Sequence, residues 1–457
     1  MINHSINDII VALSTPPGTS AIGVIRLTGK GCIDFIDNFF SQSLSKKPSH
    51  TIHFGLLGMP GKTIDECLVA IFRAPRSYTK EDVVEISCHG SPYILDSVLQ
   101  FCVKNGARMA NKGEFTLRAF LNGQLDLAQA EAVADIISSD SRLSHSMALK
   151  QLRGGFSNKI VELREALISF ASLIELELDF GEEDVTFANR KDLQDTISTL
   201  KPVLLNLIQS FELGNSLKTG IPTVIAGKPN AGKSTLLNAL LNENRAIVSD
   251  IPGTTRDIIE DYLIIDGIKF ILNDTAGLRE TTDEIERIGV SKTKDKLSKA
   301  QLILYVVDVT KTSPQQAAEE IQSFSSSNNI ILILNKMDLY PTLDIESYNN
   351  KSDKLQVIPI SALNKMNTEY LRETMRSFIS DQNSQDVSLV NNIRHFEALQ
   401  KTLEAIEATE TALANNVTGD FLAMDLRQAL HHLGLITGEI HTDDLLENIF
   451  SKFCIGK

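Results

Sequence analysis

The sequence contains no tryptophan, and aromatic residues make up 6% of its 457 positions. It also lacks an apolar run long enough to span a membrane, and its first seven residues have neither the basic nor the apolar stretch of a signal peptide. Its 44 lysine and arginine residues face 58 acidic ones, which gives a net charge of −14. This charge argues against a bare nucleic-acid-binding protein, so an RNA substrate would require a local basic patch or a basic partner. We expect a cytoplasmic, globular protein of several domains with no membrane association.

Cysteine is scarce. The five cysteines, at positions 32, 67, 88, 102 and 454, form no CxxC pair and no zinc-binding spacing. This pattern predicts reduced thiols rather than disulfides. Cys454 is unusual because it lies in SKFCIGK at the very end of the chain, where a frayed segment would expose a reactive thiol.

The strongest motif is TVIAGKPNAGKSTLLNALL, from Thr223 to Leu241, which matches the phosphate-binding pattern GxxxxGK[ST]. An apolar run precedes it and a helical leucine pattern follows it, as in a strand–loop–helix unit. The glycines allow backbone N–H groups to face phosphates, Lys233 would contact the β- and γ-phosphates, and Ser234 would ligate Mg²⁺. The nucleotide-binding residues predicted here are Asn230, Ala231, Gly232, Lys233, Ser234 and Thr235.

Four more motifs follow in the order typical of a Ras-like GTPase: PGTTRD, DTAG, NKMD and SAL. Thr255 is a candidate switch ligand of Mg²⁺, and Asp274 is a candidate for holding Mg²⁺ through water. The carboxylate of Asp338 could accept hydrogen bonds from N1 and N2 of guanine, which predicts GTP rather than ATP. The residues predicted to bind nucleotide or ions in these four motifs are Pro252, Gly253, Thr254, Thr255, Asp274, Thr275, Ala276, Gly277, Asn335, Lys336, Met337, Asp338, Ser361, Ala362 and Leu363.

The residue after DTAG is Leu278, where Ras-type enzymes have the glutamine that orients the attacking water. An apolar side chain cannot orient water, so hydrolysis needs another polar group. The segment LRETTDEIERIG offers Glu280, Asp283, Glu284 and Glu286, and the residues alone leave the choice among these four open.

The flanks of the nucleotide motifs predict helices. Apolar residues recur at steps of three and four in residues 162–180 and again in 394–413, which is typical of long amphipathic helices. Thr442 is predicted to cap a last helix, and His431 and His432 are predicted to be packing or surface residues. Short β-rich runs between turns predict an α+β domain at the N-terminus.

The predicted fold class is therefore multidomain α+β and α/β. The predicted domains are 1–120, an α+β domain; 121–216, the first part of a helical domain; 217–382, an inserted Ras-like P-loop GTPase domain; and 383–457, the second part of the helical domain with the CIGK tail.

Across nearly the whole chain, this arrangement resembles the tRNA modification GTPase family MnmE, also called TrmE. The matching stretches include TPPGTSAIGVIRLTG, SYTKEDVVEISCHG, GEFTLRAFLNGQLDLAQAEAVADII and ITGEIHTDDLLENIFSKFCIGK. The resemblance implies a GTP-hydrolysing homodimer that uses Mg²⁺ and K⁺ and forms a heterotetramer with MnmG (GidA). It implies that the complex adds an aminomethyl or carboxymethylaminomethyl group to C5 of the wobble uridine of certain tRNAs. The one-carbon unit would come from 5-formyl- or methylene-tetrahydrofolate, bound by the N-terminal domain, which would also mediate dimerisation.

By position, the resemblance implies that Glu286 is the catalytic residue that orients the attacking water. It also implies a potassium site at Asn230, Ser249, Ile251 and Thr254, in a nucleotide-binding loop that includes Asp250. A monovalent cation there would stabilise charge between the phosphates, as an arginine finger does.

The resemblance implies folate contacts at Arg26, Glu85 and Lys457. Gln124 stands where the family can have a lysine, so it keeps a hydrogen bond but lacks the charge. The tail is implied to fold back toward the folate site, which would place Cys454 near the one-carbon unit as a nucleophile. The alternative for Cys454 is a small packing residue, and the alternative for the whole chain is a GTPase switch in RNA or ribosome assembly without modification chemistry.

Overall fold

The computed structural model describes residues 8–179, 190–242, 261–273, 300–322, 329–348, 355–380, 389–415 and 417–457. Contacts divide the chain into two units. The first comprises Met1–Ser138, Ala148–Leu205 and Glu397–Lys457; the second comprises Ser139–Met147 and Asn206–Phe396. Each unit is described by itself.

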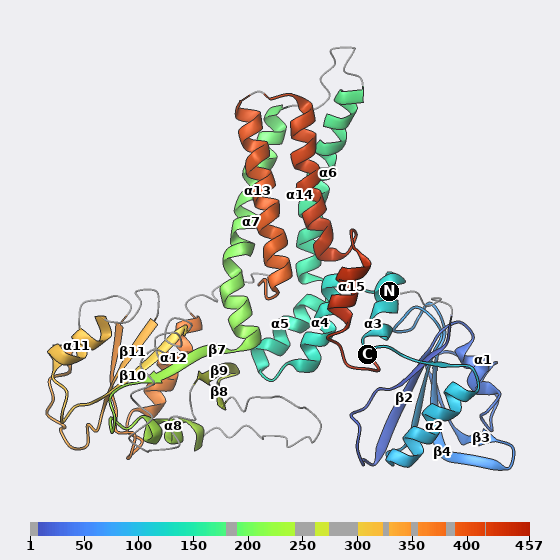
Figure 1. Ribbon diagram of the computed structural model, residues 1–457, viewed down its shortest axis with the longest axis horizontal. Helices are drawn as coiled ribbons and strands as arrows, with labels where there is room; N and C mark the ends of the chain where they lie inside the picture. Colours follow the sequence, from blue (N-terminus) through green and yellow to red (C-terminus); the bar gives the residue numbers. More distant parts are fainter. Residues whose placement is uncertain are drawn as a thin grey trace. The chain divides into compact units, whose positions relative to one another are not determined.

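The N-terminal part of the first unit is a six-stranded sheet of order β3-β4-β5-β2-β1-β6 (Figure 1). Its strands are β1 (Ile10–Leu13), β2 (Ile22–Thr28), β3 (Thr51–Met59), β4 (Lys62–Phe72), β5 (Val83–His89) and β6 (Arg108–Met109). All neighbours are antiparallel except β1 and β6, which are parallel. The predicted β-rich runs therefore form strands, and they belong to one sheet.

Helices cover both faces of this sheet. Side chains along each strand point alternately to the two faces, and both faces carry apolar residues. Val11, Ile25 and Leu27 pack on one face with α1 (Cys32–Asp37) and α2 (Pro92–Lys104). Ile10 and Ala12 point to the other face, against Phe115 of α3 (Glu114–Leu121). Helix α2 begins with Pro92, whose fixed φ suits the first turn, after Ser91 in extended conformation.

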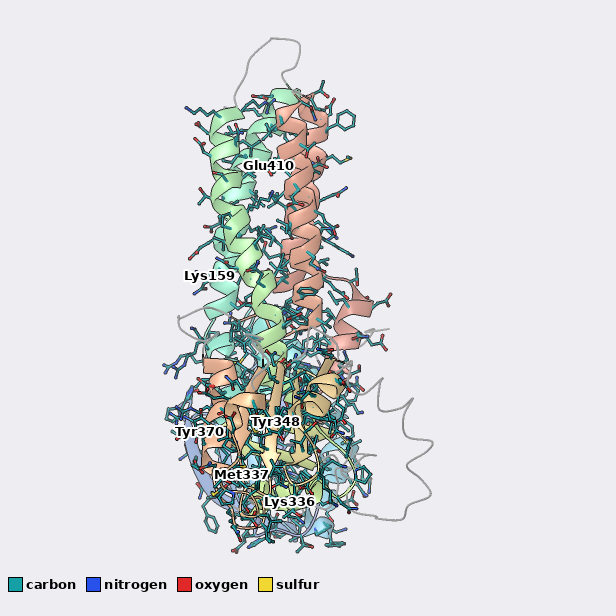
Figure 2. The ribbon with its side chains drawn as sticks, turned by 90° about the vertical axis from the view of Figure 1, so that its left-hand side faces the viewer. Lys159, Lys336, Met337, Tyr348, Tyr370 and Glu410 are labelled. Atoms are coloured by element: carbon teal, nitrogen blue, oxygen red, sulfur yellow. The ribbon has the colours of Figure 1, made fainter. Side chains whose placement is uncertain are left out.

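The rest of the first unit is helical. Its helices include α4 (Leu127–Ser138), α6 (Gly155–Asp179), α14 (Gly419–Thr437) and α15 (Asp443–Phe450), and it shares α5 (Arg142–Leu152), α7 (Arg190–Thr219) and α13 (Ile393–Ala414) with the second unit. Helix α6 packs along α14. Lys201 of α7 pairs with Glu407 and Glu410 of α13, the latter labelled in Figure 2. Segments from before and after the nucleotide motifs therefore build one helical domain, as predicted.

The second unit contains a six-stranded sheet of order β12-β11-β10-β7-β9-β8, in which only β8 is antiparallel to its neighbour. The strands are β7 (Ile221–Ala226), β8 (Asp261–Ile265), β9 (Ile268–Asn273), β10 (Leu302–Asp308), β11 (Asn329–Asn335) and β12 (Leu355–Pro359). The other elements are α8 (Lys233–Asn242), α11 (Pro314–Gln322), the short 3₁₀ helix Ile345–Tyr348 and α12 (Thr368–Ser380).

Strand β10 shows why these strands are uniformly apolar. Leu302, Leu304 and Val306 enter one core cluster, and the residues between them enter a second cluster on the opposite face. A parallel sheet covered on both faces requires apolar side chains in both directions. This arrangement, with the helical domain and the N-terminal sheet, confirms the predicted fold class.

Helix α15 ends the regular structure. The hydroxyl of Thr442 accepts a hydrogen bond from the backbone N–H of Leu445, and Asp443 and Asp444 lie in the first turn. This confirms the predicted cap. The predicted domain boundaries stay predictions, and residues 381–388, which follow the end of α12 at Ser380, lie outside the described residues. Within the described ranges, no helix is long and apolar enough to cross a membrane.

Candidate functional site

The predicted phosphate loop joins β7 to α8, and two of its glycines cannot be replaced without a clash. Gly227 has φ +141°, and a Cβ there would lie 2.1 Å from the carbonyl oxygen of Val306. Gly232 has φ +96°, and a Cβ there would lie 2.2 Å from Nδ2 of Asn335. The loop is therefore pressed against β10 and the residue that ends β11. Any residue with a Cβ would clash at either position, so the loop can pack this closely only with glycine.

The loop holds its own lysine. Nζ of Lys233 donates to the carbonyl oxygens of Gly227, at 2.8 Å, and Lys228, at 2.9 Å. Ser234 and Thr235 follow in the first turn of α8, where backbone N–H groups have no partner within the helix. An ammonium group and a helix N-terminus at one place suit the phosphates of a nucleotide.

The NKMD motif ties this loop to the SAL motif. Buried Asn335 donates from Nδ2 to the carbonyl oxygen of Ala231, at 2.8 Å, and its Oδ1 accepts from the backbone N–H of Ala362, at 3.0 Å. Lys336, labelled in Figure 2 beside Met337, donates to the carbonyl oxygen of Asn230 at 3.0 Å. Three motifs separated along the chain therefore form one site.

The acidic residue of the motif, Asp338, is held by a hydroxyl group of the SAL motif. Oδ1 of Asp338 accepts a hydrogen bond from Oγ of Ser361 at 2.6 Å, and the side chain is exposed at the edge of the sheet. The same hydroxyl accepts from the backbone N–H of Asn364 at 3.3 Å. Leu363, which is 77% exposed, lies next to them. This arrangement leaves a carboxylate free to accept from a guanine ring.

Asp308 belongs to this site although the sequence analysis did not select it. It ends β10 and is buried, and its Oδ2 accepts from Nζ of Lys336 at 2.7 Å. Burial would raise the pKa of Asp308, but hydrogen bonds from Lys336 and Thr310 outweigh burial and lower the pKa. The signal was available in LILYVVDVT, where a lone carboxylate follows an apolar strand.

Several predicted residues lie outside the described residues, so their roles stay predictions. They are Ser249, Asp250, Ile251, Pro252, Gly253, Thr254, Thr255, Asp274, Thr275, Ala276, Gly277 and Glu286.

A second group of predicted residues meets in the N-terminal sheet. Arg26 of β2 and Glu85 of β5 are partners in the strand register, and Nε of Arg26 donates to Oε1 of Glu85 at 2.9 Å. Nη1 of Arg26 also approaches the carbonyl oxygen of Gly456 at 3.4 Å. The pair and the end of the chain are therefore adjacent, although 430 positions separate Arg26 from Gly456.

The terminal segment is held by its backbone. The carbonyl oxygen of Gly456 accepts from Oγ of Ser14 at 3.2 Å, and Ile455 forms a β-bridge with Lys112. A Cβ on Gly456 would lie 2.4 Å from the carbonyl oxygen of Leu13. Phe453 is buried, whereas the thiol-bearing Cys454 is exposed. This exposure does not support packing as the role of Cys454.

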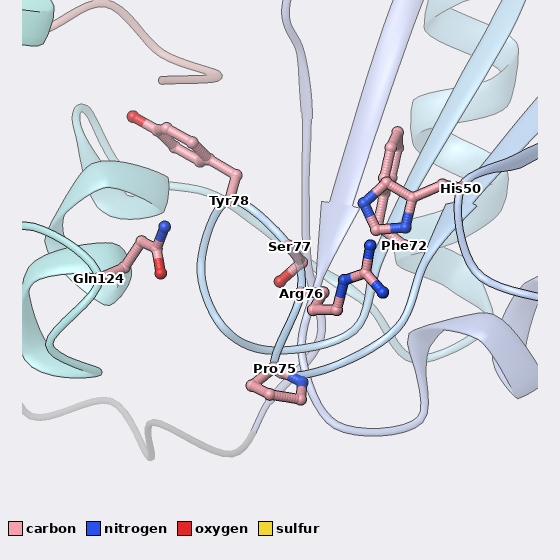
Figure 3. A pocket seen from close by; sticks show the side chains of 7 residues that line it. All are labelled: His50, Phe72, Pro75, Arg76, Ser77, Tyr78 and Gln124. Carbon is pink, nitrogen blue, oxygen red and sulfur yellow. The ribbon is translucent and has the colours of Figure 1, made fainter.

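Gln124 lies in a pocket of about 480 Å³ beside the loop from β4 to β5 (Figure 3). Tyr78 connects this pocket to the Arg26–Glu85 pair, because the guanidinium carbon of Arg26 is 5.5 Å from the centroid of the Tyr78 ring. Oη of Tyr78 lies 2.8 Å from Oγ1 of Thr116 in α3, which fixes the ring. Burial raises the pKa of Tyr78.

Elsewhere, the rings of His431 and His432 in α14 meet edge to face at 5.4 Å. Burial lowers the pKa of His432. Among the described residues, no group of three or more histidine, cysteine, aspartate or glutamate side chains could hold a metal ion.

Comparisons with known proteins match both units. The model of the MnmE helical domain matches residues 127–454, and that of the GTP-binding protein TrmE N-terminus matches residues 9–124. The tRNA modification GTPase MnmE of Cytophaga hutchinsonii is 52% identical, over 100% of this chain and 98% of its own length. The MnmE of Christiangramia forsetii is 49% identical, over 99% of this chain and 100% of its own length. The chain belongs to the MnmE family of tRNA modification GTPases. It is therefore a GTP-binding, GTP-hydrolysing enzyme of tRNA modification, as predicted.

Among solved structures, that of an Aquifex aeolicus Era variant bound to GDP·AlF₄⁻ is 28% identical over 40% of this chain and 65% of that chain, with a TM-score of 0.27. That score does not establish a common fold, so membership of the MnmE family rests on the sequence matches.

Proposed function

We propose that this MnmE family member hydrolyses GTP in the cytoplasm and, with MnmG, installs the aminomethyl or carboxymethylaminomethyl group at C5 of the tRNA wobble uridine. The proposal rests on one observation: a chain of this family contains both a set of linked GTP motifs and a tail that reaches the N-terminal sheet. One unit holds the linked GTP motifs. The other unit brings the CIGK tail to Arg26.

The nucleotide half of the proposal assigns a role to each motif. Lys233 binds the phosphates, Asn335 holds the loop against the base-binding segment, and Asp338 accepts hydrogen bonds from guanine. Mg²⁺ would be held by Ser234 and Thr255, and it supplies charge neutralisation between the phosphates. Leu278 stands where Ras-type enzymes have the glutamine that orients the attacking water. Glu286 performs that role in this chain.

Potassium is the proposed substitute for an arginine finger. Asn230 has φ +61°, a left-handed conformation that is costly for a residue with a side chain. Its carbonyl oxygen accepts from Lys336, which holds the residue in this conformation. Asn230, Ser249, Ile251 and Thr254 would bind the ion, which supplies positive charge next to the phosphates.

The folate half of the proposal uses the tail and the N-terminal sheet. Arg26 is 18% exposed and Glu85 28% exposed, so the pair is partly shielded from water but accessible to a ligand. A guanidinium suits the carboxylates of a folate and a carboxylate suits the N–H groups of its pterin. Lys457 and Gln124 complete the contacts, and Cys454 lies exposed on the same tail. A 5-formyl- or methylene-tetrahydrofolate supplies the one-carbon unit.

A homodimer through the N-terminal sheet fits the surface of β3 and β4. Ile52, Phe54 and Leu56 alternate along one face of edge strand β3, and they are 67%, 58% and 41% exposed. Leu68, the register partner of Phe54 on β4, is also exposed at 44%. A row of exposed apolar side chains on an edge pair is typical of an interface, and we assign it to a second copy of this chain.

Complementation tests the proposal. A bacterial strain lacking its own MnmE is supplied with this chain, with Lys233→Ala or with no chain, and its tRNA nucleosides are measured by mass spectrometry. We expect the modified wobble uridine to return only with the unaltered chain. Normal growth and ribosome profiles without the modified nucleoside would instead indicate a GTPase switch in RNA or ribosome assembly.

A further inference from the structure

A pocket of about 290 Å³ lies at one edge of the sheet in the second unit. Strand β12 ends the order of that sheet, and β11 is its only neighbour among the described strands. The pocket is lined by this edge strand, by the 3₁₀ helix Ile345–Tyr348 before it and by α12 after it. No described residue of the nucleotide motifs lines the pocket, so the GTP site does not account for it.

The backbone of β12 presents free hydrogen-bonding groups at this edge. The N–H of Ile360 donates to the carbonyl oxygen of Leu334 in β11 at 2.8 Å. Backbone groups of successive residues in a strand point alternately to its two neighbours, so the residues two and four positions before Ile360 also face β11. The N–H and C=O groups of Leu355 and Val357 therefore face away from the sheet, and no other described residue pairs with them.

Only one end of this edge is protected. Pro359 has no N–H, and its carbonyl oxygen accepts a hydrogen bond from Nδ2 of Asn367 at 2.9 Å. Proline on an edge strand hinders pairing with a further strand. Pro359 and Asn367 thus close the edge on the C-terminal side, whereas residues 355–357, which line the pocket, stay open to an added strand.

The walls of the pocket fit the side chains of an added strand, which would point alternately to the two faces of the sheet. Leu355 and Val357 pack on the face that Ile345 covers, whereas Ile358 packs on the opposite face with residues of α12. Ile345 and Tyr370 line the pocket from these two sides. Tyr370, labelled in Figure 2, is 56% exposed, and exposed tyrosines often anchor protein partners.

The charge around the pocket is negative. Glu346 lines it, and none of the described lining residues is basic. Glu373 of α12 is exposed one turn after the tyrosine. The arginines of α12 do not offset these acids, because Arg372 is buried and Arg376 pairs with Asp266 at 2.9 Å. Such a rim favours a partner that carries lysine or arginine.

We propose that the edge of β12 binds an extended, basic segment of a partner protein, which joins the sheet as a further strand. The outward groups of residues 355–357 form hydrogen bonds with the backbone of the segment. Apolar side chains of the segment pack on Ile345 and Tyr370, and its basic side chains approach Glu346 and Glu373. Because the open stretch is short, the binding is weak and reversible.

Fluorescence polarisation with the full-length chain tests the inference. The probe is a short fluorescein-labelled peptide of alternating lysine and valine. One comparison peptide has glutamate in place of lysine. Another keeps the sequence of the probe but has N-methyl groups on alternate backbone amides, which block strand pairing. The probe should bind with a Kd at least about tenfold lower than that of either comparison peptide, because they lack the charge or the backbone hydrogen bonds.

Variants locate the binding on the chain. Val357→Pro removes an outward N–H, which an edge strand tolerates, and should raise the Kd of the probe about fivefold. Tyr370→Ala should raise it about tenfold, because the aromatic anchor is lost. Glu319→Lys in α11, an exposed acid that does not line the pocket, is the matched control and should leave the Kd unchanged. If Val357→Pro lowers the denaturant midpoint, Tyr370→Ala decides.

Glu346→Lys separates charge recognition from folding, because it should weaken binding of the lysine peptide and strengthen binding of the glutamate peptide. The inference is overturned if the unaltered chain does not bind the probe, or if the N-methylated peptide binds equally well. An unchanged Kd in both Val357→Pro and Tyr370→Ala overturns it too. Loss of self-association in Val357→Pro, measured by light scattering, would assign the edge to a second copy of this chain and likewise overturn the inference.

Discussion

At the scale of single residues, the proposed guanine site depends on one hydroxyl and one carboxylate. Ser361 donates to Asp338 at 2.6 Å and is fully buried, so the carboxylate is held in one orientation before the base arrives. Rigid polar groups discriminate well because a wrong base leaves them without partners.

Asp338→Asn should therefore transfer base preference from guanine to xanthine. The amide keeps its contact with Ser361 but can no longer accept two hydrogen bonds from guanine N–H groups. Discrimination of roughly 10⁴-fold can depend on such pairs. A competition assay with GTP, xanthosine triphosphate and ATP measures the change. Retained GTP selectivity would show that Asp338 does not contact the base.

Glu286→Ala should slow GTP hydrolysis by about a hundredfold or more, because a group that positions the attacking water is removed. Nucleotide affinity should stay near that of the unaltered chain, since Glu286 is not assigned a contact with GTP. Single-turnover hydrolysis and fluorescent-nucleotide titration measure the two quantities. A collapse of affinity would assign Glu286 a structural role.

Cys454→Ser should separate the two activities. The thiol is exposed, so the nearly isosteric change should alter the free energy of unfolding by less than about 1 kcal/mol. GTP hydrolysis should remain, and modified wobble uridine should fall in cells that carry only this variant. Full modification would show that the thiol takes no part in the chemistry. Loss of both activities would instead assign the tail to the fold or the dimer.

At the scale of elements, a cluster of charges joins β1, β6 and α3. Arg118 of α3 is buried and pairs with Asp8, Glu81 and Glu114, and Arg108 of β6 donates to Glu114 at 2.6 Å. Burial would raise the pKa of both Asp8 and Glu114, but hydrogen bonds from the two arginines outweigh burial and lower both pKa values. Removing the negative charge from such a cluster leaves a buried guanidinium without compensation.

Acid should therefore destabilise this region. Carboxylates with lowered pKa stabilise the fold fully above their unfolded pKa of about 4, and this contribution disappears as the pH falls through their folded pKa. Denaturant midpoints measured from pH 7 to pH 3 should fall below about pH 4.5. Glu114→Gln should lower the midpoint at pH 7 and flatten the decline, and Glu397→Gln in α13, an exposed acid, is the control. Parallel pH curves for Glu114→Gln and the unaltered chain would contradict this account.

At the scale of the whole molecule, the residues proposed for the nucleotide and those proposed for the folate lie in different units. The P-loop and the NKMD and SAL motifs lie in one unit, and Arg26, Glu85, Gln124 and the tail lie in the other. The nucleotide unit carries no evident arginine finger in its motifs, which is why a monovalent cation is proposed for hydrolysis.

Potassium should accelerate GTP hydrolysis and sodium should not. The expected result follows from Leu278 after DTAG, which cannot orient water, and from Asn230 in the phosphate loop. Rates are compared in potassium chloride and sodium chloride at equal ionic strength, with caesium chloride as a control for ion size. Equal rates in all three salts would remove the proposed cation site.

The sequence alone predicted the elements and motifs that depend on neighbouring residues. The phosphate loop, the cap at Thr442 and the helical repeats of α6 and α13 follow from short-range spacing, because backbone conformation and amphipathic faces are set within a few residues. Family resemblance added Arg26, Glu85, Gln124 and Lys457 by position. Both the fold class and the main parts of the GTP site were therefore within reach of the sequence.

Only the tertiary structure placed Asp308 against Lys336, Gly456 against Arg26, and Arg76 in the pocket with Gln124. These residues are far apart in the chain, and the order of the strands in each sheet brings them together. No local periodicity specifies which strand lies beside which, since that choice depends on packing the whole core at once. The same packing decided that Phe453 is buried and that the neighbouring Cys454 faces solvent.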